Sequence, residues 1–69
     1  MKKQTINFIK QYRKALGLTQ TQLGSILCVS KNTVSHWEIG DFDPSINAIF
    51  KLCDVFECSF EELFIQIRV

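Results

Sequence analysis

GLTQTQLGSILCVSKNTVSHWEIG, residues 17–40, is the stretch that decides the fold of this 69-residue chain. It contains two short amphipathic segments, and each begins after a residue whose side chain can cap a helix. Thr19 opens a capping box that predicts a helix over Gln20–Leu27. Ser30 caps a second predicted helix, which spans Lys31–Glu38. The stretch therefore predicts two helices that a tight turn forces to cross steeply.

Further helices are predicted on both sides of this unit. The first spans Thr5–Leu16, because apolar residues recur there at intervals of three and four, and Gly17 can end it in the left-handed conformation. Another spans Ile46–Phe56, capped by Ser45 or by Asp43 with proline at the first helical position. Its broad apolar face predicts the central buried element of the fold and comprises Ile46, Ile49, Phe50, Leu52, Cys53, Val55 and Phe56.

The C-terminal residues predict one more helix and then a strand. Ser59 opens a capping box for a fifth helix that passes through Phe60, Leu63 and Phe64. After it, Ile65, Ile67 and Val69 alternate with polar residues, which is typical of a short strand rather than of more helix. The predicted fold class is therefore all-α, a single five-helix domain over residues 1–69 with a short C-terminal strand.

Core-facing positions can be assigned within the first three helices. The second helix should send Leu23, Ile26 and Leu27 inward, and the third helix Val34 and Trp37. Gly24 costs its helix about 1 kcal/mol relative to alanine. A small residue is explained at this position if another helix crosses closely, and we expect such a crossing. Arg13 lies on the apolar side of the first helix, where a guanidinium needs a buried partner, and Glu38 is the acid that we expect to supply it.

The other sides of the Lys31–Glu38 helix carry short polar residues. These are Lys31, Asn32, Thr33, Ser35 and His36. A face made only for solubility would more often carry Glu and Lys in pairs, so donors and acceptors of this kind favour contact with base edges in a DNA major groove. For Thr33 or Ser35 taken singly, a merely hydrophilic surface is an equal alternative.

Charge is unevenly distributed along the chain, although its net value is only +1. Residues 1–36 hold six basic residues and no acid, whereas residues 37–69 hold seven acids and two basic residues. Such a domain can present a positive face to a polyanion. Lys2 and Lys3 are interpreted separately, as a solvated N-terminal arm.

The cysteines and the lack of a long apolar run predict a reducing, cytoplasmic setting with no membrane contact. Cys28, Cys53, Cys58 and His36 lack the paired CxxC spacing of a zinc site, so buried inert thiols are favoured over a metal centre. His36 has no evident carboxylate or nucleophile partner in the sequence. We therefore predict neither a cofactor nor an enzyme.

These motifs resemble the Cro/C1-type helix-turn-helix repressors, also called the XRE family. The resemblance covers Ile9–Leu63 and lies in LGLTQTQLG, VSKNTVSHWEIG and PSINAIFKLCDVF followed by SFEEL. It implies a five-helix bundle of the lambda repressor-like DNA-binding type, which binds double-stranded operator DNA and usually does so as a dimer. Arg13 and Glu38 match the buried ion pair that such domains commonly hold.

The resemblance also implies roles for individual residues. Base contacts fall on Lys31, Asn32, Ser35 and His36, and phosphate contacts on Gln20, Ser30 and Thr33. Helix N-termini present free N–H groups to phosphate, which agrees with the second set.

Three features depart from the family pattern. Cys28 stands where glycine is usual, and Glu57 with Cys58 replace a glycine and an aliphatic residue. Asp41 and Asp43 follow the third helix, where relatives often carry basic residues, and two acids there should weaken non-specific DNA affinity.

Two kinds of function are consistent with these residues. The leading one is a DNA-binding transcriptional regulator, a repressor that forms a homodimer through the apolar residues Phe64, Ile65, Ile67 and Val69. The alternative, favoured by Asp41, Asp43 and the apolar tail, is a protein-interaction module such as an antitoxin or an anti-repressor partner.

Overall fold

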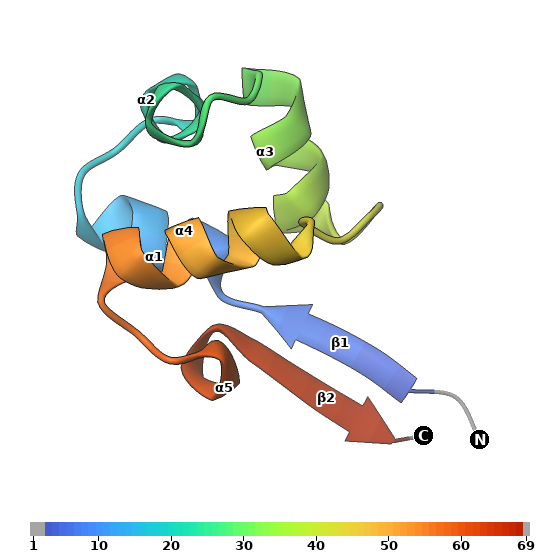
Figure 1. The fold of residues 1–69 in the computed structure, drawn as a ribbon. Helices are drawn as coiled ribbons and strands as arrows, with labels where there is room; N and C mark the ends of the chain where they lie inside the picture. Colours follow the sequence, from blue (N-terminus) through green and yellow to red (C-terminus); the bar gives the residue numbers. More distant parts are fainter. Residues whose placement is uncertain (1–2, 69) are drawn as a thin grey trace.

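The structure is a computed structural model that describes the backbone of residues 3–68 and the side chains of residues 7–64. It confirms the predicted five helices and the C-terminal strand (Figure 1). The elements in chain order are β1 (Lys3–Asn7), α1 (Ile9–Ala15), α2 (Gln20–Leu27), α3 (Lys31–Ile39), α4 (Ile46–Phe56), α5 (Phe60–Leu63) and β2 (Phe64–Arg68). The helices form a bundle with α2 and α3 on one side, and the two strands lie side by side away from them.

The first strand corrects the prediction that a helix begins at Thr5. β1 pairs antiparallel with β2, in a register that joins Asn7 to Phe64 and Lys3 to Arg68. The backbone N–H of Phe8 continues this pairing by donating to the carbonyl of Leu63 at 2.9 Å. The strand partner of β1 is about sixty residues away in the sequence, so a local periodicity could not reveal it.

The caps predicted from the sequence hold the starts of four helices. Thr19 and Ser59 each form a full capping box, with Gln22 and Glu62 respectively. Ser30 caps α3, and Ser45 caps α4 by accepting from the backbone N–H of Ala48. Each hydroxyl satisfies an N–H group that would otherwise have no intrahelical partner.

One backbone motif ends each of the helices α1 to α4. A residue with positive φ follows the helix, namely Gly17, Cys28, Gly40 or Glu57. The N–H of the next residue then donates to a carbonyl five positions earlier, as in a Schellman motif. These donor–acceptor pairs are Leu18 to Arg13, Val29 to Gly24, Asp41 to His36 and Cys58 to Cys53, at 2.8–3.1 Å. The motif thus places the donor residue of each pair next to the acceptor residue five positions before it in the chain.

The core is smaller than the sequence predicts. It consists of Ile9, Leu23, Leu27, Val34, Trp37, Ala48, Leu52, Phe56, Leu63 and Phe64. Ile26 was expected inside but is 50% exposed, and Leu16 of the first predicted apolar stripe is exposed as well. Helix α4 was expected to be buried on a broad face, yet Ile46 is 72% and Phe50 66% exposed. Its covered face is narrower because α4 packs on the bundle with one side only.

The exposed side of α4 continues onto α5 as an apolar groove of about 400 Å³. We call it the α4–α5 groove, and its lining residues are Ile46, Ile49, Phe50, Cys53, Cys58, Ser59 and Phe60. Phe64 lies beneath it in the core and stacks on Phe60 with ring centroids 5.2 Å apart. The prediction that Phe64 forms a dimer contact is therefore wrong for the folded chain, because its side chain is already buried. The side chains of Ile65 and Ile67, and the whole of Val69, lie outside the described residues.

Within residues 3–68, no helix has the length and apolar character that crossing a membrane requires.

Candidate nucleic-acid interface

The turn between α2 and α3 sets how α3 is presented. Cys28 takes the left-handed conformation with φ 59°, and Val29 donates its N–H to the carbonyl of Gly24 at 2.8 Å. A Cβ on Gly24 would lie 2.6 Å from the carbonyl oxygen of Val29. Glycine is therefore required by the backbone of the turn and by Ser30, the residue that caps the next helix, rather than by side chains of a crossing helix.

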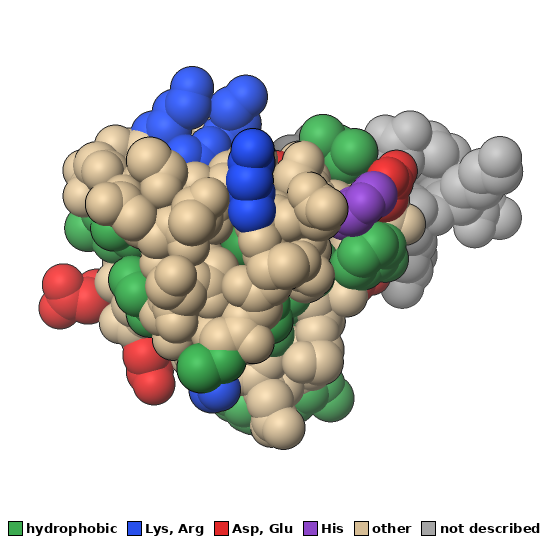
Figure 2. Space-filling model, turned by 90° about the horizontal axis from the view of Figure 1, so that it is seen from above, with side chains coloured by type: hydrophobic (Ala, Val, Ile, Leu, Met, Phe, Trp, Pro, Cys, Tyr) green, Lys and Arg blue, Asp and Glu red, His purple; other side chains and the backbone are tan. Residues whose placement is uncertain are grey.

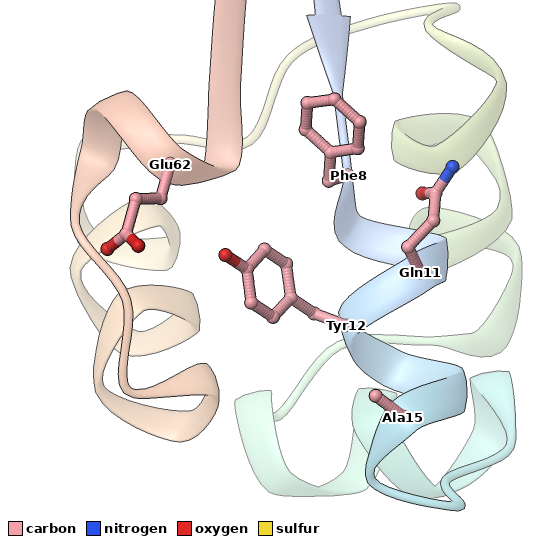
Figure 3. Close-up of a pocket in the computed structure, with 5 residues that line it drawn as sticks. All are labelled: Phe8, Gln11, Tyr12, Ala15 and Glu62. Atoms are coloured by element: carbon pink, nitrogen blue, oxygen red, sulfur yellow. The ribbon is translucent and has the colours of Figure 1, made fainter.

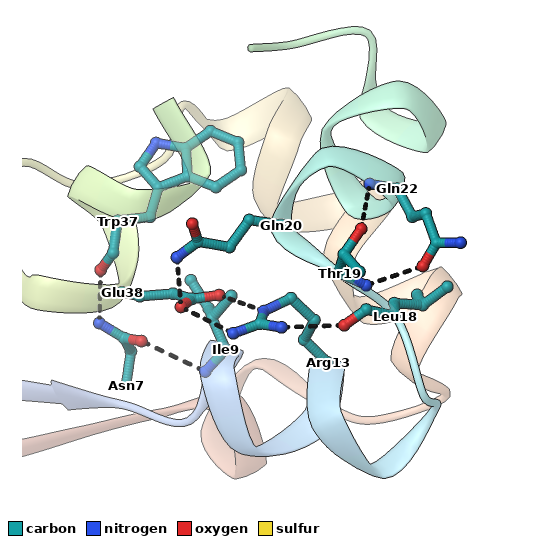
Figure 4. Close-up of polar contacts among 9 residues, drawn as sticks. All are labelled: Asn7, Ile9, Arg13, Leu18, Thr19, Gln20, Gln22, Trp37 and Glu38. Atoms are coloured by element: carbon teal, nitrogen blue, oxygen red, sulfur yellow. Dashed lines mark hydrogen bonds and ion pairs between the residues drawn. The ribbon is translucent and has the colours of Figure 1, made fainter. Parts of the chain in front are cut away.

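A buried polar network fixes the inner side of α3 against α1 and α2 (Figure 4). Arg13 donates through Nε to Glu38 Oε2 at 2.6 Å and through Nη2 to Oε1 at 3.2 Å. The two side chains, whose pairing was expected, are 10% and 3% exposed. Arg13 Nη1 also donates to the carbonyl of Leu18 at 2.8 Å. Removal of either charge would leave the other buried and unpaired.

Gln20 takes part in this network, which the sequence did not predict. Its amide Nε2 donates to Glu38 Oε1 at 3.1 Å. The side chain expected at a DNA phosphate is thus directed toward the ion pair (Figure 4). The backbone N–H groups of the first turn of α2 have no intrahelical partner, and that of Gln22 donates to the Thr19 hydroxyl.

A second link, also missed in the sequence, ties the end of α3 to the sheet. Asn7 Nδ2 donates to the carbonyl of Trp37 at 3.0 Å, while its Oδ1 accepts from the N–H of Ile9 at 3.2 Å (Figure 4). One asparagine therefore satisfies the N–H of Ile9 at the start of α1, whose N-cap residue Phe8 supplies no side-chain cap, and also holds α3. An asparagine just before an apolar helical run is the signal that could have indicated this cap.

The outer side of α3 is left open to solvent. Lys31 and Asn32 are exposed, and Thr33, Ser35 and His36 are partly exposed. Ser30 accepts from the N–H of Thr33 at 3.1 Å, and the hydroxyls of these two residues lie 3.0 Å apart. The Ser30 hydroxyl therefore serves first as the helix cap and the Thr33 hydroxyl contacts it, while Lys31, Asn32 and Ser35 form no side-chain hydrogen bond among the described residues.

The face formed by α2 and α3 carries mainly uncharged polar groups (Figure 2). Basic side chains gather along one edge of it and another stands near its middle, whereas acidic side chains lie at its margins. The predicted base-contacting residues all lie on α3, and the predicted phosphate-contacting residues lie at the starts of α2 and α3.

His36 has a carboxylate partner that the sequence analysis missed. Its Nδ1 lies 2.8 Å from Asp41 Oδ2, and its ring stacks on Phe42 with centroids 5.0 Å apart. The end of α3 brings them together, because Gly40 reverses the chain and the N–H of Asp41 donates to the carbonyl of His36 at 3.0 Å. The sequence signal for this contact was that His36 and Asp41 lie five residues apart with Gly40, which ends the helix, between them.

The three cysteines do not lie together in the described part of the chain. Cys28 lies at the end of α2, whereas Cys53 and Cys58 lie at the α4–α5 groove, and no three potential metal ligands come together within the described residues. A shallow hollow between α1 and α5 is lined by Phe8, Gln11, Tyr12, Ala15 and Glu62 (Figure 3).

Two protonated groups lie close to this hollow. Burial raises the pKa of the Tyr12 phenol above its ordinary value of 10.0, and Cys58 and Glu62 raise it further. Burial likewise raises the pKa of the Cys58 thiol above 9.0, with added effects of Cys53 and Glu62. Both groups are therefore kept neutral at physiological pH, which suits packing rather than nucleophilic attack.

Two capped helices are joined by a tight turn, and the second of them, α3, has an inner side held by a buried ion pair and an open polar outer side. These features define a helix-turn-helix protein. The chain belongs to the helix-turn-helix family, whose sequence pattern matches residues 9–63. The predicted resemblance to Cro/C1-type regulators is confirmed by this match and by the relatives below.

Similar proteins include regulators from Bacillus subtilis and Methanocaldococcus jannaschii and a repressor of solved structure. The chain is 34% identical to the HTH-type transcriptional regulator YgzD of Bacillus subtilis, over 84% of this chain and 88% of YgzD. It is 39% identical to the HTH-type transcriptional regulator MJ0272 of Methanocaldococcus jannaschii, over 86% and 89% of the two chains. The P22 c2 repressor in complex with a synthetic operator matches with a TM-score of 0.72 and 30% identity, over 77% and 80% of the two chains.

Proposed function

We propose that this protein is a sequence-specific DNA-binding transcriptional regulator that reads the major groove with α3. The observation that carries the proposal is the asymmetry of α3: Glu38 is paired on its buried side, while Lys31 and Asn32 are open on the other. Polar side chains that have no partner on a rigidly held helix are available to base edges.

Each exposed residue of α3 has a preferred partner in DNA. Lys31 can donate to guanine O6 or N7, and Asn32 can form two hydrogen bonds with adenine. Each such contact contributes about 1–3 kcal/mol of discrimination between bases. Ser35 and His36 are one helical turn farther along α3 and extend the same readout.

Phosphate contacts are proposed at the two helix starts. The first turns of α2 and α3 carry backbone N–H groups without an intrahelical partner, and such groups favour phosphate. Gln20 would contribute chiefly through its backbone, since its amide is bonded to Glu38. Ser30, whose hydroxyl caps α3, and Thr33, whose hydroxyl contacts it, lie at the start of the helix where a phosphate would sit.

The match to the P22 c2 repressor supports a repressor in particular. YgzD and MJ0272 are named transcriptional regulators, and the P22 c2 repressor is seen bound to its operator. A role of this kind needs neither cofactor nor catalysis, and the free cysteines fit a cytoplasmic protein.

We further propose that the regulator acts as a homodimer. Ile46, Phe50 and Phe60 form an exposed apolar patch around the α4–α5 groove, and patches of this kind mark interaction sites. A second copy is the occupant that a protein reading two half-sites about 34 Å apart requires. The apolar tail at Ile65, Ile67 and Val69 is the other contact proposed for the same dimer.

Sedimentation of variants separates these two contacts. If the α4–α5 groove is the dimer interface, Phe50→Glu gives a monomer and Ile67→Glu does not. The reverse result would show that the dimer forms through the apolar tail. A wild-type protein that stays monomeric both free and on DNA contradicts the dimer.

Selection of bound fragments from a random duplex pool tests the proposed function. We expect a recovered motif with two related half-sites, and an affinity for it that falls steeply with salt. Weak binding to every duplex, unchanged by Lys31→Ala or Asn32→Ala, would contradict DNA recognition. In that case the apolar patch favours the second candidate, a protein-interaction module such as an antitoxin.

A further inference from the structure

The end of α3 carries a pair of residues that the proposed DNA contacts do not yet explain. Asp41 places an acid beside the proposed DNA face, where it repels phosphate, and Phe42 leaves an aromatic ring half exposed next to it. Both residues contact the same side chain, His36. A single role, holding the His36 imidazole in a fixed orientation, explains the positions of both Asp41 and Phe42.

We propose that Asp41 is a positioning residue that fixes the tautomer of His36, so that His36 Nε2 accepts a hydrogen bond from an exocyclic amine of a base in the major groove. This inference rests on the proposed function. It identifies the chemistry that His36 reads: N4 of cytosine or N6 of adenine, the amino groups that project into the major groove.

The geometry determines the tautomer. A carboxylate only accepts hydrogen bonds, and Asp41 Oδ2 is 2.8 Å from His36 Nδ1, so Nδ1 must carry a proton. In the neutral ring Nε2 then has a free lone pair and acts as an acceptor. Without the carboxylate, either nitrogen could hold the proton, and Nε2 would present a donor to some bases and an acceptor to others.

The backbone and the neighbouring ring hold this arrangement in place. The N–H of Asp41 donates to the carbonyl of His36 at 3.0 Å, which anchors the carboxylate next to the imidazole. Phe42 covers one face of the ring at a centroid distance of 5.0 Å and an interplanar angle of 23°. The side chain of His36 is still 45% exposed, which leaves the part of the ring not used by Asp41 and Phe42 open to a ligand.

Nitrogen NMR of the free protein tests the tautomer without any DNA. At about pH 8.5, where an ordinary imidazole is neutral, we expect the proton of His36 on Nδ1 in the wild type. Asp41→Ala should move the proton largely to Nε2. Asp43→Ala is the matched control, because Asp43 is an exposed acid of the same loop with no hydrogen bond or ion pair among residues 7–64, and it should leave the tautomer unchanged. A wild-type proton mainly on Nε2 would overturn the inference.

Binding to the selected duplex tests the readout. At one base pair, His36→Ala and Asp41→Ala should each reduce discrimination by about five- to tenfold, and the double variant should lose no more than either single variant. Asp43→Ala should strengthen binding to all duplexes, as removal of an acid does, without changing discrimination.

The outcomes separate this inference from the proposed function. If His36→Ala reduces discrimination but Asp41→Ala behaves like Asp43→Ala, the positioning role is wrong and DNA recognition stands. If no duplex is preferred by the wild type, both fail.

Discussion

The inner side of α3 packs Val34 and Trp37 into the core and pairs Glu38 with Arg13, whereas its outer side leaves Lys31 and Asn32 exposed. Among the described residues no buried side-chain nitrogen or oxygen lacks a hydrogen-bond partner, whereas Lys31 and Asn32 on the outer side are exposed. The contrast teaches that the exposed side can recognise a ligand because the buried side prevents α3 from turning. Changes on the inner side should therefore cost stability, and changes on the outer side should cost recognition.

The largest expected effect follows from breaking the inner network. Glu38→Ala leaves the Arg13 guanidinium buried without its partner, and we expect the free energy of unfolding to fall by about 3–5 kcal/mol. Urea denaturation measures this loss. Asp54→Ala, at an exposed acid of α4, should change stability by no more than about 0.5 kcal/mol. Equal losses for the two variants would contradict the role given to the pair.

The next effect concerns the turn that presents α3. Gly24→Ala places a Cβ 2.6 Å from the carbonyl oxygen of Val29, so the backbone must move. We expect a loss of about 1–3 kcal/mol, although alanine elsewhere in a helix is favoured over glycine by about 1 kcal/mol. Thermal or urea unfolding is the measurement, with Ser25→Ala on the exposed side of the same helix as control. A stabilised Gly24→Ala protein would show that the turn tolerates the contact.

The outer side should respond in the opposite way. Asn32→Ala is expected to reduce discrimination for adenine at one position by about 1–3 kcal/mol, while stability stays within about 0.5 kcal/mol. Asn47 is a matched control, because it is exposed at the second position of α4 as Asn32 is in α3. Competition binding with substituted duplexes gives the comparison. Similar losses of base discrimination in Asn32→Ala and in the Asn47→Ala control would show that the outer side of α3 has no particular role in recognition.

A smaller effect is expected at the left-handed positions. Cys28 has φ 59°, a conformation that disfavours residues with a Cβ by about 1–2 kcal/mol. Cys28→Gly should raise stability by at most about 1 kcal/mol, since glycine also loses more entropy on folding. Cys28→Ser separates loss of the thiol from relief of the backbone and should give no gain. A destabilised Cys28→Gly protein would mean that the thiol contributes more than its conformation costs.

The smallest effect concerns pH and groups distant from the outer side of α3. The folded-state pKa values of Cys58 and Tyr12 are raised above 9.0 and 10.0, so the folded protein holds these protons more tightly than the unfolded chain. Their stabilising contribution is complete below pH 9 and declines as the pH rises through the raised values. Urea denaturation from pH 8 upward should show this decline, and Cys58→Ala combined with Tyr12→Phe should reduce it. A decline of the same size in that double variant would assign it to other groups.

Much of the fold could be predicted because its signals are local. Thr19, Ser30 and Ser59 lie directly before helices that they cap, and Gly17 and Gly40 end helices in the left-handed conformation. Strand β1 could not be predicted, since it exists only through pairing with β2 at the other end of the chain. The exposure of Ile46 and Phe50 was missed for a related reason: periodicity reveals an apolar face but not how much of it another element covers.

The site shows the same division. The pairing of Arg13 with Glu38 was expected because a lone guanidinium on an apolar face needs a partner. The contacts of Gln20 and of Asp41 depend on where side chains point after the helices have packed, and residue spacing alone does not fix this direction. Asp41, which was expected only to reduce the affinity for DNA, is thus a hydrogen-bond partner of His36.

The most direct test of the central claim is an amide NMR titration of the protein with its selected duplex. Recognition by the outer side of α3 predicts that the largest shift changes fall on Lys31, Asn32, Ser35 and His36, with small changes around Phe50 that reflect dimer contact alone. Changes concentrated at the α4–α5 groove, with the signals of α3 unmoved, would contradict it.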